Sequence, residues 1–146
     1  MLRNLLICSF FIYFVLGQGY YEPPTPQELW YTQVFDHFNS SDTRTFQQRY
    51  LIYDDDYNNS NLPNKPLFFC PGGEADVYGG YDHNGFMFQY GSTLGAFQLF
   101  PEHRFYGQSL PFGAVNSYTA SNLAKLTIEQ VFILLLLFFK IFYIFF

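Results

Sequence analysis

A four-residue apolar run, LFFC at residues 67–70, lies between two prolines and leads directly into a glycine turn at residues 71–74 (PGGE). A short continuous apolar run is typical of a strand buried on both faces, as in a largely parallel sheet. Residues 86–94 then predict a helix, and residues 96–100 (AFQLF) predict a second buried strand. Strand, turn, helix and strand is the order of a βαβ unit, so the sequence predicts an α/β fold.

The segments around this unit are less regular. Residues 20–27 hold three prolines and predict an extended lead-in without helix or sheet pairing. Residues 45–53 (TFQQRYLIY) are rich in β-formers and predict a strand. Residues 54–66 and 75–84 are polar or glycine-rich, and we expect both to be loops. The three consecutive aspartates at the start of the first loop lack the ligand spacing of a calcium loop, which favours a solvated segment.

The first 19 residues have the three parts of a secretory signal peptide. Arg3 gives the positive region, residues 5–16 form an apolar stretch, and Gly17 and Gly19 offer a cleavage site. A membrane anchor is the alternative, but 12 helical residues rise only about 18 Å, short of a hydrocarbon core of about 30 Å. We therefore expect a cleaved signal and a protein of the secretory pathway, extracellular or lysosomal.

Secretion has two consequences for the mature chain. Its only cysteine is Cys70, which either stays free or pairs with a partner outside this sequence. Asn39 and Asn58 begin acceptor sequons, so both are predicted glycosylation sites.

The charge pattern excludes several classes of ligand. The formal net charge of −5 and the scattered basic residues argue against a nucleic-acid partner. His37, His83 and His103 lack the spacing of metal ligands, so no metal is expected, and no cofactor is expected either.

A serine hydrolase with an α/β sheet carries its nucleophile in a Gly-x-Ser-x-Gly turn. Ser109 comes nearest, in GQSLP, but proline replaces the final glycine and no helical pattern follows. We expect Ser109 not to be a nucleophile. The three histidines do not complete a Ser, Asp and His triad with it, so the sequence as written is predicted to lack catalytic residues.

Four motifs occur in a fixed order: DHF at 36–38, TFQQRY at 45–50, PGGE at 71–74 and EHRFYGQSLPFG at 102–113. Together they resemble the serine carboxypeptidase family of lysosomal Pro-X carboxypeptidase, dipeptidyl peptidase II and thymus-specific serine protease. The resemblance runs from about residue 30 to residue 130, where TIEQ at 127–130 is similar to the family's Thr-x-Glu-Gln.

This resemblance implies the N-terminal part of an α/β-hydrolase sheet, incomplete here, in a serine-type exopeptidase that cleaves near proline at a peptide end. The family's triad lies downstream, so the expected partner is a peptide substrate of the completed enzyme. Gly73 and Glu74 are the candidates for the backbone N–H of the oxyanion hole. The family motif near the site contributes Glu102, His103, Arg104, Tyr106 and Gly107, with a Glu–Arg pair expected beneath the site.

Residues 131–146 (VFILLLLFFKIFYIFF) depart from the family pattern, with 15 apolar residues and Lys140. Since no polar face remains, we expect no surface helix here and place a boundary between residues 20–130 and this tail. A truncated or read-through gene product, a short membrane segment and a lipid-anchor signal remain open. The alternative function is accordingly a non-catalytic, membrane-attached glycoprotein or binding module.

Overall fold

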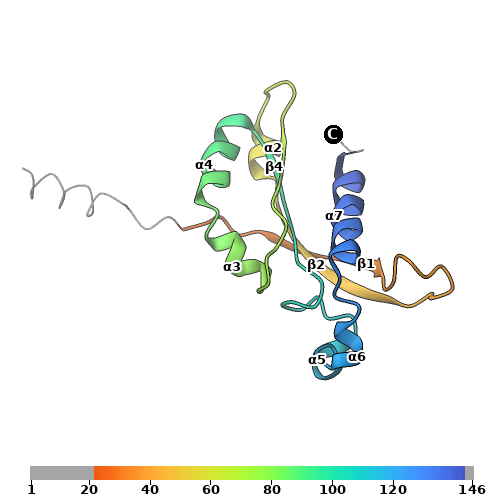
Figure 1. Cartoon of the computed structure of the whole chain (residues 1–146). Coiled ribbons are helices and arrows are strands. Elements are labelled where there is room, and N and C mark those ends of the chain that lie inside the picture. Colours follow the sequence, from red (N-terminus) through yellow and green to blue (C-terminus); the bar gives the residue numbers. More distant parts are fainter. Residues whose placement is uncertain (1–21, 144–146) are drawn as a thin grey trace, which may run out of the picture.

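The computed structural model describes residues 22–143. The predicted signal peptide, residues 1–19, lies outside the described residues, as do residues 144–146 at the end of the apolar tail. The described part is a four-stranded sheet with helices on both faces (Figure 1). The expected α/β class is confirmed in this coarse sense.

The sheet has the strand order β1-β2-β4-β3. Strands β1 (Gln27–Val34) and β2 (Thr45–Tyr53) pair antiparallel, and β2 pairs antiparallel with β4 (Phe97–Pro101). Only β3 (Leu67–Phe69) runs parallel to its neighbour β4. The predicted βαβ unit is therefore confirmed, but the expectation of a largely parallel sheet is wrong for the described residues.

Strand β3 also differs from its sequence-based prediction. It was expected to be buried on both faces, yet all three of its residues are only half-buried. The reason is its place at the edge of the described sheet, where it pairs with β4 on one side only. An edge strand keeps a row of backbone groups available for another strand.

Short helices replace two predicted loops. Helix α2 (Asp55–Asn59) lies in the polar segment after β2, and α3 (Val77–Asp82) lies in the glycine-rich segment after β3. Helix α3 forms despite two internal glycines because the Asp76 carboxylate accepts a hydrogen bond from the Tyr78 N–H and caps the helix. The predicted helix follows as α4 (Gly85–Leu94).

The two faces of the sheet carry separate cores. Helices α3 and α4 cover one face, where Leu51 and Phe100 of the sheet pack against Tyr81 and Phe88 (Figure 1). Helix α7 (Ile128–Tyr143) covers the other face. Two short helices, α5 (Gly113–Asn116) and α6 (Ala120–Leu123), connect β4 to α7.

Most of the apolar tail forms helix α7, which packs one side against the sheet. Leu134 and Phe138 of α7 are each 1 % exposed and pack against Phe46 and Tyr50 of β2. An aromatic sheet face supplies a partner for one side of an apolar helix, so burial replaces the missing amphipathic pattern. Helix α7 is continuous from Ile128, and it therefore crosses the boundary placed at residue 131.

Candidate functional site

The loop between β3 and α3 holds both predicted oxyanion-hole residues. Gly72 begins it, and its N–H donates to the Pro101 carbonyl at the end of β4 over 2.8 Å. A Cβ at Gly72 would lie 3.0 Å from that carbonyl oxygen, so only glycine lets the loop run this close to β4. The loop is therefore fixed at its base by the neighbouring strand.

Beyond Gly72 the loop is open to solvent. Gly73 and Glu74 are exposed, and a Cβ on Gly73 would meet nothing within 4 Å. No acceptor among residues 22–143 takes a hydrogen bond from the backbone N–H of either residue. An unengaged backbone N–H on a fixed loop can serve as one of the donors of an oxyanion site.

The Glu74 side chain lies beside the family motif of residues 102–113. It is hydrogen-bonded to Tyr106, whose pKa is raised by burial and by the negative charge of Glu74. The Tyr106 ring packs edge-on against His103 with 5.0 Å between centroids. Glu74 and His103 also line a hollow of about 360 Å³ whose other wall is the start of α7. The structure thus brings together Gly73, Glu74, His103 and Tyr106.

Glu102 connects the chain segments next to these four residues through hydrogen bonds. Its carboxylate is fully buried and accepts five hydrogen bonds. The donors are Arg49 Nη2 (2.6 Å), Val77 N (3.1 Å), Gln108 N (2.9 Å), Ser109 N (2.9 Å) and Ser109 Oγ (2.7 Å). One side chain therefore ties strand β2, the start of α3 and the loop after β4 to a common point.

The expected Glu–Arg pair exists, but its arginine is Arg49 rather than Arg104. Arg49 is 2 % exposed, and its Nη2 lies 2.6 Å from Glu102 and 2.5 Å from Asp76, the cap of α3. Burial alone would lower the pKa of Arg49, but hydrogen bonds to Glu102 and Asp76 raise it above its ordinary value. Arg49 therefore stays charged and balances the negative charge of both carboxylates.

Ser109 is part of this buried network. It is fully buried, its Oγ donates to Glu102, and the same Oγ accepts from the Arg49 backbone N–H over 2.9 Å. A hydroxyl engaged in this way fixes the loop against β2. Ser109 therefore has a structural role in the buried network around Glu102.

Arg104 belongs to a second buried network, formed by residues far apart in the sequence. Its guanidinium donates to Gln130 Oε1 (3.1 Å) and to the Phe35 carbonyl (3.0 Å). Burial lowers the pKa of Arg104 to about 10, although the charge of Asp36 acts in the opposite sense. Gln130 in turn donates to Asp36 over 2.5 Å, so the first and last family motifs meet at Arg104.

Asp36 is the anion of this second network. Lys125 lies 2.5 Å away, and hydrogen bonds from Lys125 and from the Phe38 N–H lower the pKa of Asp36 to about 2. The carboxylate is therefore ionised throughout the pH range of acidic compartments.

This shift predicts a pH dependence of stability. The folded-state pKa of Asp36 lies below its unfolded value of about 3.9, so its contribution is present above pH 3.9 and lost as pH falls towards 2. We expect Asp36→Asn to lose part of the stability at neutral pH and to show a smaller further loss between pH 4 and pH 2. Urea unfolding of both chains at several pH values measures this. The assignment would be contradicted if the free energy of unfolding fell with pH as steeply in Asp36→Asn as in the original chain.

The remaining predicted residues lie apart from the candidate loop. His37 Nε2 is buried without a hydrogen-bond partner among the described residues, and burial lowers the pKa of His37. His83 is exposed and bonds to the Gly79 carbonyl. Burial also raises the pKa of the free Cys70 thiol. Both sequon asparagines, Asn39 and Asn58, are exposed.

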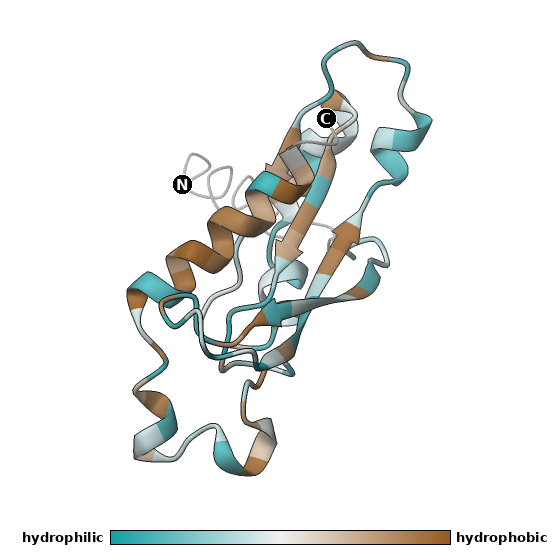
Figure 2. Ribbon diagram, turned by 90° about the vertical axis from the view of Figure 1, so that its right-hand side faces the viewer, coloured by the Kyte–Doolittle hydropathy of each residue, from teal (hydrophilic) through white to brown (hydrophobic). Residues whose placement is uncertain are grey.

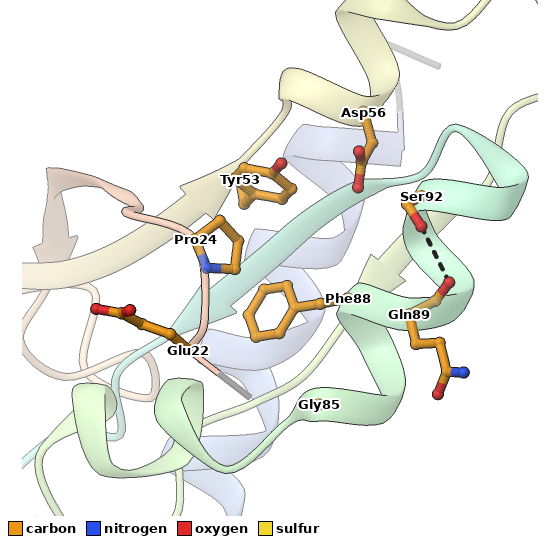
Figure 3. Close-up of a pocket in the computed structure, with 8 residues that line it drawn as sticks. All are labelled: Glu22, Pro24, Tyr53, Asp56, Gly85, Phe88, Gln89 and Ser92. Carbon is orange, nitrogen blue, oxygen red and sulfur yellow. Dashed lines mark hydrogen bonds between the residues drawn. The ribbon is translucent and has the colours of Figure 1, made fainter. Parts of the chain in front are cut away.

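A larger hollow, of about 680 Å³, lies between α2, α4 and the N-terminal segment. Figure 3 shows the rings of Pro24, Tyr53 and Phe88 between the carboxylates of Glu22 and Asp56. None of the predicted site residues lines it. Among residues 22–143, no group of three or more His, Cys, Asp or Glu side chains could hold a metal ion.

Sequence reasoning missed Arg49 as the shared partner of Glu102 and Asp76. A signal did exist for Arg49, because it is the charged residue of an otherwise β-forming segment that was predicted to be a strand. An arginine inside a half-buried strand needs an acidic partner, and Glu102 follows the strand that pairs with it.

Comparison of the sequence with known proteins gives a family match over most of the described residues. The serine carboxypeptidase S28 family matches residues 33–143, which include most of α7. Lysosomal Pro-X carboxypeptidase of Mus musculus is 38% identical over 102 residues, covering 70% of this chain and 20% of that protein.

Two further relatives match to a similar extent. The putative serine protease pcp-1 of Caenorhabditis elegans is 37% identical, with 74% of this chain and 19% of that protein covered. Thymus-specific serine protease of Mus musculus is 35% identical, with 68% and 19% covered. The chain spans about a fifth of the length of the curated relatives it matches. The family match and these identities show that the chain belongs to the serine carboxypeptidase S28 family.

Proposed function

We propose that this chain forms the N-terminal part of a secretory or lysosomal serine-type exopeptidase that acts near proline at the end of a peptide. The observation that carries the proposal is the loop of Gly73 and Glu74, which has unengaged backbone N–H groups and a base held by β4. Relatives named lysosomal Pro-X carboxypeptidase support the substrate class and the compartment.

In this proposal the chain contributes electrostatic stabilisation rather than a nucleophile. In α/β-hydrolases an N–H of the loop after the third strand joins the N–H that follows the nucleophile to bind the oxyanion of the tetrahedral intermediate. Gly73 or Glu74 supplies the first donor. The serine, aspartate and histidine come from the part of the family fold beyond this region.

The hollow beside Glu74 gives the peptide a place next to the oxyanion donors. Its walls are apolar on the side of α7, where Val131 and Leu135 contribute, and polar at His103 and Glu74. A substrate residue with an apolar side chain fits this combination.

The alternative function is a membrane-attached glycoprotein without activity, which the exposed apolar side chains of α7 favour. The glycan sites at Asn39 and Asn58 are compatible with both functions. No helix among residues 22–143 is both long and apolar enough to cross a membrane.

A chimeric enzyme tests the proposal. Residues 33–130 replace the aligned segment of mouse lysosomal Pro-X carboxypeptidase, and hydrolysis of a Pro-X peptide is measured. We expect activity within roughly tenfold of the parent enzyme, because every hydrogen-bond donor to the Glu102 carboxylate lies between residues 33 and 130 and is transferred with it. A chimera that is secreted and folded but hydrolyses no peptide would contradict the proposal.

Two variants of the chimera locate the oxyanion donor. Gly73→Pro removes one N–H and should lower kcat by roughly 10²–10³-fold if that group binds the oxyanion. Gly73→Ala keeps the N–H, and because nothing lies within 4 Å of the added Cβ, it should leave kcat nearly unchanged.

A further inference from the structure

The larger hollow is built from three parts of the chain that are far apart in the sequence. Its volume of about 680 Å³ is within the range of ligand-binding pockets. The N-terminal segment contributes Glu22 and Pro24, the region of β2 and α2 contributes Tyr53 and Asp56, and α4 contributes Phe88 (Figure 3). The proposed peptidase function uses none of these side chains, so the hollow is without a role so far.

The N-terminal wall of this hollow is fixed by two hydrogen bonds. The Tyr81 hydroxyl donates to the Pro24 carbonyl over 2.9 Å, and Tyr81 itself is 1 % exposed in the core under α3 and α4. Further along the segment, Gln27 Nε2 donates to Asp54 Oδ1 over 2.9 Å, and Asp54 directly precedes α2. Because the wall is held on both sides, the hollow is formed before a ligand arrives, and less ordering is needed on binding.

Aromatic rings form the apolar part of the hollow. Tyr53 and Phe88 pack edge to face with 6.0 Å between their centroids, and Phe88 also stacks on Phe100 of β4. These contacts hold the orientation of the rings. The face of an aromatic ring attracts a cation, and the planar guanidinium of arginine stacks on such faces.

The two carboxylates of the hollow lack a counter-charge. Glu22 and Asp56 lie with the rings between them (Figure 3), and neither forms an ion pair with a basic residue among residues 22–143. Arg49 and Lys65, the bases nearest to Asp56 in the sequence, are engaged with other carboxylates and with backbone carbonyls respectively. Burial and the charge of Asp55 raise the pKa of Asp56. A bound cation would therefore stabilise the ionised form of Asp56.

We propose that this hollow binds the side chain of an arginine that belongs to a second peptide or protein chain. The guanidinium stacks on the aromatic rings and donates to the Asp56 carboxylate, and Glu22 adds a second negative charge. The methylene stem of the arginine lies against Pro24. The formal net charge of −5 favours the approach of a basic partner.

Other occupants fit the hollow less well. An apolar ligand would leave both carboxylates without a partner in a partly desolvated site. Among residues 22–143, no group of three or more His, Cys, Asp or Glu side chains could hold a metal ion. Lysine has a cationic group without a planar face, so it stacks on rings less effectively than arginine.

The arginine site is independent of the proposed peptidase function. No residue that lines this hollow also lines the hollow beside Glu74. Helix α7, which Figure 2 shows as hydrophobic along most of its length, packs on the other face of the sheet and contributes nothing to the arginine site. Binding is therefore measured on the chain itself, without an activity assay.

Nuclear magnetic resonance of the ¹⁵N-labelled secreted chain, titrated with N-acetyl-arginine amide, tests the proposal. N-acetyl-citrulline amide is the matched ligand, since it has nearly the same shape without the charge. We expect the largest shifts at the backbone amides of Asp56, Gln89 and Ser92, and a dissociation constant roughly tenfold higher for citrulline. N-acetyl-lysine amide should bind at least about threefold more weakly than the arginine compound.

Asp56→Asn tests the carboxylate, and Asp55→Asn is the matched control. Both substitutions remove one negative charge from the first turn of α2, but only Asp56 lines the hollow. We expect the dissociation constant for the arginine compound to rise roughly fivefold in Asp56→Asn and less than about twofold in Asp55→Asn. Tyr53→Leu, checked for folding by circular dichroism, should raise it roughly threefold through loss of a ring.

Three results would overturn the arginine site. The first is equal affinity for the arginine and citrulline compounds, which needs only the original chain. The second is an equal effect of Asp55→Asn and Asp56→Asn, which would show a general attraction by charge. The third is a set of shifts confined to residues outside the hollow. Equal affinity for the lysine compound would overturn the choice of arginine.

Discussion

Glu102→Ala is expected to lower the free energy of unfolding by about 5 kcal/mol, enough to leave most of the secreted chain unfolded. The substitution removes a fully buried carboxylate that accepts five hydrogen bonds. Arg49 then keeps a buried charge whose remaining close partner, Asp76, is itself half exposed. The backbone N–H groups of Val77 and Gln108 and the Ser109 hydroxyl also lose this acceptor, and each buried unsatisfied group is costly. The Ser109 N–H keeps only the Tyr106 carbonyl.

Urea unfolding followed by circular dichroism measures this loss, and Glu28→Ala is the matched control. Glu28 also faces Arg49, but at 3.5 Å and with a side chain that is 34% exposed. A solvent-screened pair contributes less than about 1 kcal/mol, so the control should remain folded. Equal effects of the two substitutions would show that the Glu102 network does not hold the loops together.

Gly107→Ala is expected to cost about 4 kcal/mol of unfolding free energy, from overpacking and backbone strain together. Gly107 has a φ of +54°, which L residues with a side chain rarely adopt. An added Cβ would overlap Glu102 Oε1 and would lie 3.0 Å from Arg49 Nη2. Both atoms belong to the buried ion pair, so neither can move without breaking it.

Gly80→Ala is the control for this prediction. Its Cβ would meet nothing within 4 Å, and its φ is not positive. Alanine inside α3 should therefore be neutral or slightly stabilising, since it has the higher helix propensity. Thermal unfolding of the two variants compares them directly. A Gly107→Ala chain as stable as the Gly80→Ala chain would refute the crowding at Glu102.

Local patterns predicted the central part of the fold well. Strand β2 spans Thr45–Tyr53, as its alternating β-formers indicated, and the β3–α4–β4 order follows from apolar runs and glycines. These elements are specified by nearest-neighbour periodicity and turn chemistry, which a single sequence displays. The open loop at Gly73 and Glu74 was predictable for the same reason, because glycine signals its own backbone geometry.

Long-range pairings were not predictable in this way. The partner of Glu102 is Arg49, which lies 53 positions earlier, and Asp36 meets Gln130 over a separation of 94. The strand pattern indicates that Arg49 needs an acidic partner, but the local sequence does not say which carboxylate that partner is. The antiparallel pairing of β2 with β4 places Arg49 beside the residue that follows β4, and only the sheet topology contains that information.

Helix α7 shows a different limit. An all-apolar segment is compatible with a membrane, a buried core or no structure, and its hydropathy does not choose among them. The choice is made by the aromatic face of β2, where Phe46 and Tyr50 receive Leu134 and Phe138. The sequence shows that face as a pattern of alternating residues, but it does not show which segment packs on it.

The central claim is that the loop of Gly73 and Glu74 serves a serine nucleophile in the completed family fold. Labelling of the chimeric enzyme by a fluorophosphonate tests it most directly, because the reagent reacts only with a serine activated within a formed oxyanion site. We predict stoichiometric labelling of the chimera and of its Gly73→Ala variant, with labelling of Gly73→Pro slowed by roughly 10²-fold or more. A folded, secreted chimera that is not labelled would contradict the claim, whereas equally fast labelling of Gly73→Pro would assign the donor to the Glu74 N–H.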